Sequence, residues 1–472
     1  MKKTKIVCTI GPSTDDENIM RELMKNGMDV ARFNFSHSDH SVHKARFETV
    51  SRLRKELGVN VATLLDTKGP EVRLKNFKDH KPVTIKDGEK FTLTTREVEG
   101  DETICSITFP QLPKDVSVGT RILINDGNIE LKALKVDNTD IVCEVIHGGV
   151  VSDHKGINVP DVNLSMPYIS DADMADLEFG AKMGFDYIAA SFVRTGADVI
   201  YLRKFTQSLG WFNPRIIAKI ENAQGVANID EILEAADGIM VARGDMGVEI
   251  PFEQIPAIQK ELIRKAYNAG KNVITATQML ESMITNARPT RAEITDVANA
   301  IYDGSSAIML SGETAAGKYP VEAVKTMSLI AETTEKDIDY ISRFKKRADE
   351  RNSTITDAIS HATVTTAHDL NAAAILTVTK GGTTARTLSK FRPNCPIIAL
   401  TTDETTCHQL NLSWGIQAGI IEEKTSTDEL IRHALERSVE LGYLKKGDLV
   451  VITAGVPLGM SGTTNLLKVE RA

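Results

Sequence analysis

The hydrophobic pattern of this chain begins with short apolar runs separated by longer amphipathic stretches. Residues 5–10, 29–35 and 61–66 each have the apolar content of a buried strand. From Ser41 to Leu57, apolar side chains recur at every third or fourth position, which predicts an amphipathic helix. Strands that alternate with helices in this way indicate a parallel α/β sheet or barrel.

The pattern changes between residue 70 and about residue 166. Residues 91–94 and 121–124 alternate between apolar and polar positions, and turn signals such as Asn125-Asp126-Gly127 separate the alternating stretches. No long helical period occurs in this part of the sequence. We therefore predict a small all-β barrel domain that is inserted into the α/β domain.

After the insertion the strand–helix alternation resumes. Further strands are predicted at 186–193, 215–222, 238–245, 272–278 and 306–310. Together with the first three they make eight βα units over roughly 245 residues, which fits a TIM (β/α)8 barrel of the usual length. A third region, with strands predicted at 373–379, 396–401, 418–421, 449–454 and 466–469, indicates a smaller C-terminal α/β domain.

These patterns divide the chain into three domains. The predicted bounds are 1–69 and 167–345 for the two parts of the barrel, 70–166 for the inserted lid domain, and 346–472 for the C-terminal domain. A charged helix is predicted near residues 345–351.

The composition indicates a globular protein with several domains and argues against a nucleic-acid-binding protein. Of the 472 residues, 42% are hydrophobic and 25% are charged, as in a globular protein with several domains. The net charge of −8 argues against nucleic-acid binding. Five scattered cysteines without CxxC spacing indicate reduced thiols and a cytoplasmic location. The N-terminal apolar run is too short for a signal peptide or a membrane span.

Two of the predicted barrel strands end in charged residues. Because side chains alternate along a strand, we expect Lys219 and Glu221 to share one face, and Arg243 and Asp245 to share another. Buried ionic groups are costly unless they are paired or hold a metal. Two carboxylates beside a lysine suit a Mg²⁺-dependent reaction on an anionic substrate. A purely structural Lys–Glu pair is the alternative interpretation.

Polar residues end the other predicted barrel strands as well, where a TIM barrel carries its chemistry. On the second strand, Arg32, Asn34 and Ser36 share one face by parity. The other strand ends contribute Thr9, Asp66, Thr67, Lys68, Ser191, Thr277 and Ser311. Cations combined with carboxylates favour phosphoryl transfer, which depends on positioning and on neutralising charge. Neither a GxxxxGK[ST] loop nor a GxGxxG loop after a strand is present.

Several long motifs of the sequence resemble those of the pyruvate kinase family. They are Thr9-Ile10-Gly11-Pro12, residues 32–37 (RFNFSH), 65–71 (LDTKGPE), 218–222 (AKIEN), 241–245 (VARGD), 276–283 (ATQMLESM) and 310–314 (LSGET). They run in the family order from residue 4 to the C-terminus. The resemblance implies a cytoplasmic, homotetrameric glycolytic enzyme, the short bacterial form without an extra C-terminal domain. It would transfer a phosphoryl group from phosphoenolpyruvate to ADP, giving pyruvate and ATP.

The resemblance also implies roles for individual residues. Those that would hold Mg²⁺ (or Mn²⁺) are Glu221 and Asp245, and those that would hold K⁺ are Asn34, Ser36, Asp66 and Thr67. Glu71 matches the K⁺-requiring branch of the family. Phosphoenolpyruvate would contact Arg32, Lys219, Gly244, Asp245 and Thr277. The nucleotide would contact Asn34, His37, Arg73 and Lys155, the last from the lid.

For the chemical step, the resemblance makes Lys219 the catalytic cation, with Arg32 beside it. Thr277 and Ser311 are the candidates that relay a proton to the enolate left behind. In the C-terminal domain the resemblance implies an allosteric site for a phosphorylated effector, formed by Thr379, Lys380, Gly381, Gly382, Thr383 and Thr384, with a flexible loop at residues 455–464. Trp414 stands where relatives activated by a sugar bisphosphate carry a basic residue. The effector is therefore left open between fructose 1,6-bisphosphate and AMP or a sugar monophosphate.

Two other functions fit part of this pattern. A Mg²⁺-dependent lyase or aldolase would use Lys219 and the two carboxylates but would leave the monovalent site and Lys155 without a role. An inactive metabolite sensor predicts the loss of a catalytic residue, whereas Arg32, Lys219, Glu221 and Asp245 are all present.

Overall fold

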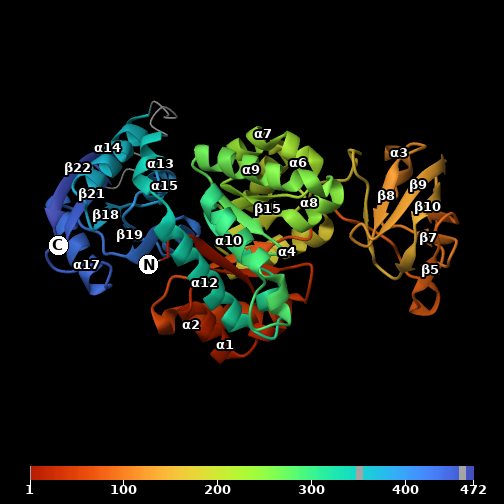
Figure 1. Cartoon of the computed structure of the whole chain (residues 1–472), viewed down its shortest axis with the longest axis horizontal. Helices are drawn as coiled ribbons and strands as arrows, with labels where there is room; N and C mark the ends of the chain where they lie inside the picture. Colours follow the sequence, from red (N-terminus) through yellow and green to blue (C-terminus); the bar gives the residue numbers. More distant parts are fainter. Residues whose placement is uncertain (1, 347–353, 457–463) are drawn as a thin grey trace.

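The computed structural model of the chain describes residues 2–346, 354–456 and 464–472. Figure 1 shows three regions in a row, with a helix-covered barrel in the centre, a β-rich region at one end and a C-terminal α/β region at the other. This architecture confirms the predicted fold class.

The central barrel is a closed ring of eight parallel strands. The strands are β1 (Lys5–Thr9), β2 (Val30–Asn34), β3 (Ala62–Asp66), β13 (Tyr187–Ala190), β14 (Arg215–Ile220), β15 (Gly238–Ala242), β16 (Asn272–Ala276) and β17 (Ala307–Leu310). Apolar side chains such as Val7, Ile217 and Ile274 fill the inside of the ring. A larger apolar layer, which includes Phe33 and Phe35, packs the outside against the helices.

The barrel strands are connected by helices that surround them (Figure 1). These are α1 (Glu17–Lys25), α2 (His40–Leu57), α4 (Asp171–Met183), α5 (Gly196–Ser208), α6 (Ala223–Ala227), α7 (Ile229–Ala235), α8 (Arg243–Glu249), α9 (Ile255–Asn268), α10 (Arg291–Asp303), α11 (Gly312–Ala315) and α12 (Pro320–Asp337). The next helix, α13 (Tyr340–Lys346), lies in the C-terminal region, where Phe344 stacks on His361. Capping residues fix several of their ends. Ser170 and Asp173 form a capping box at α4, and Thr290 and Glu293 form another at α10.

One strand prediction was wrong at a position that matters for the site. The run predicted as a strand over 238–245 ends at Ala242, and Arg243 begins helix α8. On a helix, residues two apart point about 200° away from each other, so Arg243 and Asp245 do not share a face. Arg243 contacts Asp296 of α10 at 2.7 Å, whereas Asp245 faces the cleft above the barrel.

The β-rich region lies between β3 and α4 in the sequence. Its seven-stranded sheet has the order β4 (Val72–Arg73), β12 (Gly156–Asn158), β8 (Arg121–Ile124), β9 (Ile129–Val136), β10 (Asp140–His147), β6 (Lys90–Thr94) and β7 (Ile104–Ser106). A bridge from Leu74 to Ile107 joins the two edges of this sheet. A small second sheet pairs β5 (Val83–Ile85) with β11 (Gly149–Val151), and the only α-helix among the described residues of this region is the single turn α3 (Leu112–Asp115).

The C-terminal region has a five-stranded sheet with helices around it. Its strand order is β20 (Ile416–Ile420), β19 (Ile397–Thr401), β18 (Ala374–Val378), β21 (Leu449–Gly455) and β22 (Thr464–Arg471), of which only β22 is antiparallel. The helices are α14 (Ile355–Asp369), α15 (Thr383–Lys390), α16 (Glu404–Gln409) and α17 (Thr427–Glu440). The charged helix predicted near 345–351 falls mostly outside the described residues.

The C-terminal region packs on the N-terminal ends of the barrel strands. Trp414 is 2% exposed, with its ring 5.2 Å from that of Tyr340 and 4.6 Å from the Arg392 guanidinium carbon. Arg392 donates to the carbonyl of Gly304 in the barrel at 2.9 Å, and the buried Lys5 ammonium donates to the carbonyl of Ile416 at 2.7 Å. Trp414 therefore belongs to the junction between the barrel and the C-terminal sheet.

Burial also keeps the five cysteine thiols protonated. Cys8, Cys105, Cys143 and Cys407 are buried, Cys395 is partly buried, and all five are free thiols. Burial raises the pKa of each thiol, for Cys105, Cys143 and Cys407 to about 12 and for Cys395 to about 11. Among the helices of the described ranges, none is long and apolar enough to cross a membrane.

Candidate active site

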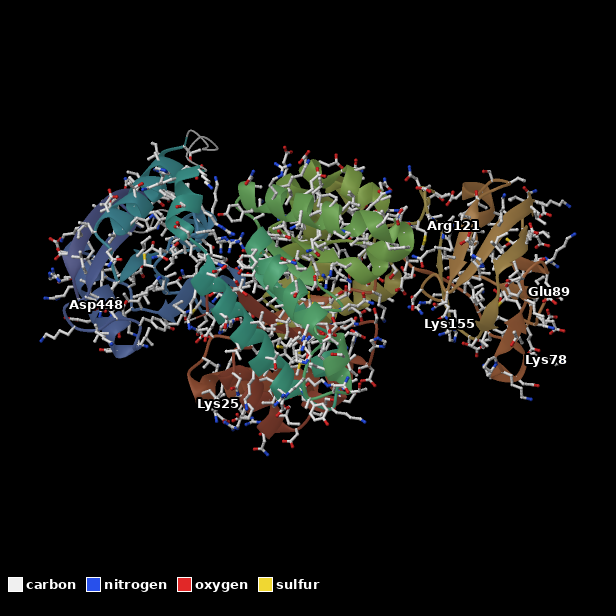
Figure 2. The ribbon with its side chains drawn as sticks, viewed as in Figure 1. Lys25, Lys78, Glu89, Arg121, Lys155 and Asp448 are labelled. Atoms are coloured by element: carbon white, nitrogen blue, oxygen red, sulfur yellow. The ribbon has the colours of Figure 1, made fainter. Side chains whose placement is uncertain are left out.

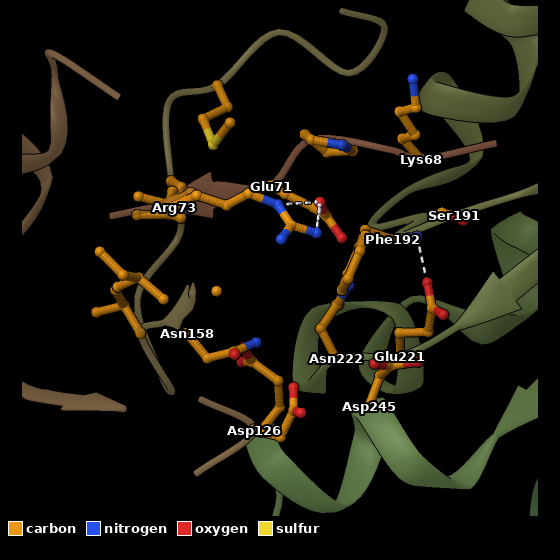
Figure 3. Close-up of a pocket in the computed structure, with 18 of the residues that line it drawn as sticks. Lys68, Glu71, Arg73, Asp126, Asn158, Ser191, Phe192, Glu221, Asn222 and Asp245 are labelled. Carbon is orange, nitrogen blue, oxygen red and sulfur yellow. Dashed lines mark hydrogen bonds and ion pairs between the residues drawn. The ribbon is translucent and has the colours of Figure 1, made fainter. Parts of the chain in front are cut away.

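A large cleft of about 1320 Å³ opens between the C-terminal ends of the barrel strands and the β-rich region. Both regions line it, as Figure 3 shows. The predicted site residues that line the cleft are Arg32, Asn34, Ser36, His37, Arg73, Lys155, Lys219, Glu221 and Asp245. Arg32 and Asn34 of β2 both line the cleft, and Ser36 lines it from the turn after that strand. Lys219 of β14 and Glu221, directly after the strand, also line it.

Lys219 lies at the centre of the barrel mouth. Its Nζ is 3.0 Å from Asp66 Oδ1 and 3.0 Å from Glu221 Oε1, and it donates to Ser191 Oγ at 2.8 Å. Burial opposes the charge of Lys219, but Asp66 and then Glu221 outweigh it and raise the pKa of the ammonium above its ordinary value. Lys219 is therefore a fixed cation throughout the physiological pH range.

Asp66 connects Lys219 to the second cation of the site, Arg32. Arg32 Nε donates to Asp66 Oδ2 at 2.6 Å, and another of its guanidinium nitrogens donates to Thr9 Oγ1 at 2.8 Å. Burial alone would raise the pKa of Asp66, but Arg32 and Lys219 lower it below the ordinary value. Arg32 thus keeps its position without a ligand, with its remaining donors available to an anion in the cleft.

Glu221 and Asp245 lie next to each other on neighbouring elements (Figure 3). The backbone N–H of Phe192 donates to Glu221 Oε2 at 2.6 Å, but Glu221 Oε1 is buried and accepts no hydrogen bond, although Lys219 is close. Burial raises the pKa of Glu221 to about 8, with Lys219 opposing the shift and the negative charge of Asp245 adding to it.

The two carboxylates fit a divalent cation. A buried carboxylate oxygen without a hydrogen bond, next to a second acid, is the environment that a cation would stabilise. Within the described ranges, no group of three or more His, Cys, Asp or Glu side chains is placed to hold a metal. Mg²⁺ often binds through one or two carboxylates and takes its remaining ligands from water and substrate phosphate.

The residues predicted to hold K⁺ lie at two depths. Asn34 and Ser36 line the cleft, and the backbone N–H of Ser36 donates to Asn34 Oδ1 at 3.1 Å. Asp66 and Thr67 are buried behind them. Both Asp66 oxygens already accept from Arg32, Lys219 or Ser191, and Thr67 Oγ1 accepts from the backbone N–H of Ser191 at 3.1 Å.

Gly244 and Thr277 are held together beside the cleft. The Gly244 N–H donates to Thr277 Oγ1 at 2.9 Å, and that hydroxyl donates to the carbonyl of Ala276 at 2.6 Å. Thr277 has φ +67°, a left-handed conformation that is uncommon for a β-branched residue. Ser311 follows β17 at the same end of the barrel. Gly244, Thr277 and Ser311 do not line the cleft itself.

The wall formed by the β-rich region contributes the remaining basic residues. Arg73 pairs with Glu71 at 2.6 Å and donates to the carbonyl of His154 at 2.8 Å, next to Lys155. In Figure 2, Lys155 lies on the side of this region nearer the barrel, whereas Glu89 lies on the far side. Asn158 donates to Glu249 of α8 at 3.0 Å across the cleft, so the two walls touch without a ligand.

The residues predicted for the effector span the segment Thr379 to Gly382 before α15 and the first two residues of that helix, Thr383 and Thr384. Thr379 Oγ1 accepts from the backbone N–H of Gly382 at 3.1 Å, and Gly382 has φ +78°, which favours glycine. Thr384 Oγ1 lies 2.6 Å from Thr464 Oγ1. Most of the predicted flexible loop over 455–464 lies outside the described residues.

From the sequence, Ser191 was named as a strand-end residue and Arg243 was also named, but neither was given a role in the site, and Phe192 was missed. Ser191 bridges Lys219, Asp66 and the carbonyl of Thr67. The backbone of Phe192, at φ +52°, holds Glu221. Arg243 donates to the carbonyl of Thr277 at 2.6 Å and is itself held by Asp296. The position of Ser191 at a strand end was recognisable in the sequence. The backbone donor of Phe192 and the Arg243–Asp296 pair, whose members are 53 residues apart, have no local sequence pattern that would predict them.

Comparison with known proteins extends the resemblance to the whole chain. The family described as "Pyruvate kinase, barrel domain" matches residues 1–324, and "Pyruvate kinase, alpha/beta domain" matches residues 357–470. A pyruvate kinase of Clostridium acetobutylicum is 48% identical over 100% of this chain and 99% of its own length. One from Geobacillus stearothermophilus is 51% identical over 99% of this chain and 80% of its own length. A crystal structure of a pyruvate kinase from Cryptosporidium parvum covers 100% of this chain and 96% of its own chain at 39% identity, with a TM-score of 0.94.

Proposed function

The chain belongs to the pyruvate kinase family, and from this premise we propose that it transfers a phosphoryl group from phosphoenolpyruvate to ADP with the help of Mg²⁺ and K⁺. One observation carries the proposal: the Lys219 ammonium lies within 3.0 Å of two carboxylates at the mouth of the barrel. A permanently charged donor in a partly closed cleft is suited to stabilise the charge that develops on a phosphoryl group in transfer.

Glu221 and Asp245 are the proposed ligands of the divalent ion. Mg²⁺ bound there would neutralise the phosphate charge of the substrate and act as a Lewis acid. The family implies a divalent metal in general, and Mg²⁺ or Mn²⁺ is the specific proposal. Asn34, Ser36, Asp66 and Thr67 are proposed to hold K⁺, with Glu71 nearby.

The side chains of the barrel position the substrate in this proposal. Arg32 binds its phosphate, Lys219 neutralises the phosphoryl group and then the enolate, and the backbone at Gly244 and Asp245 binds its carboxylate. The Gly244 N–H donates to Thr277 Oγ1, which places these two groups side by side; to bind the carboxylate, the N–H would exchange Thr277 for the substrate. Thr277 and Ser311 remain the proposed relay of the proton to the enolate carbon.

The nucleotide is proposed to bind on the side of the β-rich region. Arg73, His37 and Lys155 supply positive charge for its phosphates, and Asn34 supplies an amide. Because Arg73 and Lys155 belong to the β-rich region, its approach to the barrel would bring them towards the substrate and exclude water. This is the lid function that we propose for residues 70–166, next to barrel segments 1–69 and 167–345 and a C-terminal domain over 346–472.

Regulation and assembly complete the proposal. Residues Thr379 to Thr384 would bind a phosphorylated activator, either fructose 1,6-bisphosphate or AMP or a sugar monophosphate. The support is a glycine-containing turn with three threonines at a helix start. A homotetramer in the cytoplasm, acting in the last step of glycolysis, is the proposed setting.

A coupled assay of pyruvate formation tests the function directly. With saturating phosphoenolpyruvate, ADP and Mg²⁺, turnover is expected, and it is expected to fall sharply when K⁺ is replaced by a large organic cation. No turnover at saturating Mg²⁺ would refute the enzyme function. Turnover that is indifferent to K⁺ would remove only the monovalent-ion proposal, and activation by one of the three effectors would identify the regulator.

A further inference from the structure

A second cleft, of about 300 Å³, lies at the other end of the barrel. It opens between the N-terminal ends of β14, β15 and β16 and helix α15 of the C-terminal region. The charged and hydroxyl side chains that line it are Arg215, Asp237, Lys271, Asp357, Thr383, Arg386, Thr387 and Lys390. None of these side chains belongs to the proposed active site. Thr383 belongs to the proposed effector turn.

The charges in this cleft do not balance. Arg215 pairs with Asp237 at 2.7 Å, and Lys390 pairs with Asp357 at 3.4 Å. Two cations are left over. Lys271 donates to the carbonyl of Ala236 at 2.8 Å, and Arg386 donates to the carbonyl of Gly381. Over the ranges that the structure describes, neither cation forms a salt bridge with a carboxylate.

The surroundings make these two charges costly. Burial, and then the nearby Arg215, lower the pKa of Arg386 to about 10. Burial likewise lowers the pKa of Lys271. A charged group held in a partly buried cleft without a counter-ion favours binding of an anion, because the anion would restore the lost electrostatic stabilisation.

We propose that this cleft binds a phosphate group, free or carried by a small metabolite, between Lys271 of the barrel and Arg386 of α15. The guanidinium of Arg386 offers the planar donor pair that suits phosphate oxygens, and Lys271 offers a point charge. Thr383 adds a hydroxyl at the rim. The volume accommodates a phosphate with a small organic group attached.

This site differs from the effector site proposed above. Thr384 points to Thr464 of β22, whereas its neighbour Thr383 lines the cleft that faces the barrel. An anion held by Lys271 and Arg386 would contact the barrel and the C-terminal region at once. It would therefore stabilise their present arrangement, and the proposal does not depend on which activator binds the effector turn.

The test measures stabilisation by inorganic phosphate. The full-length protein is heated in the presence of saturating phosphoenolpyruvate and Mg²⁺ without ADP, so that the substrate part of the active-site cleft is filled and no turnover occurs. Phosphate bound at the nucleotide part of that cleft would respond equally in all the variants below. Phosphate at increasing concentration, with ionic strength held constant by chloride, is expected to raise the Tm. Arg386→Gln and Lys271→Met are each expected to weaken the apparent affinity for phosphate by tenfold or more.

Two control variants make the result decisive. Arg432→Gln removes a charge from an exposed position on α17 and is expected to keep the wild-type response. Thr384→Val removes the hydroxyl that faces β22 and is also expected to keep it. An equal response in wild type, Arg386→Gln and Lys271→Met, or a response lost only in Thr384→Val, would overturn the proposal.

A second experiment, with a sugar monophosphate, distinguishes free phosphate from a phosphorylated metabolite as the ligand. If a sugar monophosphate raises the Tm at tenfold lower concentration than inorganic phosphate, and Arg386→Gln removes that advantage, the natural ligand is a phosphorylated metabolite. Equal potency identifies free phosphate as the ligand. Because pyruvate formation is measured separately, failure here is distinguishable from failure of the proposed catalytic function.

Discussion

The two ends of the barrel hold similar side chains but pair them differently. At the C-terminal end, Lys219 touches Asp66, Glu221 and Ser191, so its charge is compensated before any substrate arrives. At the N-terminal end, Lys271 and Arg386 donate to backbone carbonyls, and neither forms a salt bridge with a carboxylate of the described residues. Burial alone therefore does not indicate the role of a cation. Its partners decide whether it is positioned for chemistry or lacks a counter-ion.

Lys219→Met removes the central charge of the C-terminal end and gives the largest expected effect. Turnover should fall by about 1,000-fold or more, because a preorganised donor to the transition state is lost. Pyruvate formation under saturating substrates measures it. Lys446→Met, at an exposed position, is the control and should leave turnover unchanged. Near-normal turnover in Lys219→Met would show that the paired cation has only a structural role.

Arg243→Lys tests whether the hydrogen bonds of Arg243, which lie behind the cleft, hold the site in position. Lysine cannot reproduce the donors that Arg243 directs to the carbonyls of Ala276 and Thr277 and to Asp296. We expect a rise in KM for phosphoenolpyruvate of about tenfold, with a smaller change in kcat, because the substitution would displace the Gly244 backbone, which we propose binds the substrate carboxylate. Arg264→Lys, on the exposed side of α9, is the matched control. An unchanged KM would contradict a positioning role for Arg243.

The pH dependence of metal binding tests the protonation state of Glu221 at the C-terminal end of the barrel. In the metal-free protein the pKa of Glu221 is raised to about 8, so the carboxyl is protonated below that pH and must lose its proton to bind a cation. Affinity for Mn²⁺ should therefore fall by about tenfold for each pH unit from 8 to 6. Electron paramagnetic resonance of free Mn²⁺ measures it.

The control for this experiment is Glu253→Gln, which removes an exposed acid and should keep the slope. Glu221→Gln should bind Mn²⁺ weakly at every pH. A wild-type affinity that does not change between pH 6 and 8 would be incompatible with the predicted protonation of Glu221.

Trp414→Phe perturbs the junction at the N-terminal end and gives the smallest expected effect. Phenylalanine leaves part of the space between Tyr340 and Arg392 unfilled. We expect a loss of about 1 kcal/mol in the free energy of unfolding, a drop in Tm of roughly 2–4 °C and unchanged turnover. Trp211→Phe, at a partly exposed position, should lower the Tm less. A large loss of turnover in Trp414→Phe would show that the junction contributes to catalysis.

The sequence predicted most of the fold because the barrel strands are short apolar runs with helical spacers. It also predicted that Lys219 and Glu221 share a face, since strand parity is strict. It failed at Asp245, because the predicted strand continued through Gly244, whereas the strand ends at Ala242 and helix α8 begins at Arg243. The left-handed backbones of Phe192 and Thr277 could not be predicted, since such conformations in non-glycine residues are imposed by tertiary contacts.

The burial of four cysteines and the partial burial of Cys395 have a practical consequence for spectroscopy. Thiols with pKa values of 11 or above form almost no thiolate at neutral pH, so maleimide reagents react with them slowly. We therefore expect little labelling of the natural cysteines in the native protein. Cysteines introduced at two exposed positions, Lys78 of the β-rich region and Glu261 of the barrel, would carry a dye pair without removal of any natural cysteine. Energy transfer between the dyes would then report changes in the separation of the β-rich region and the barrel in real time.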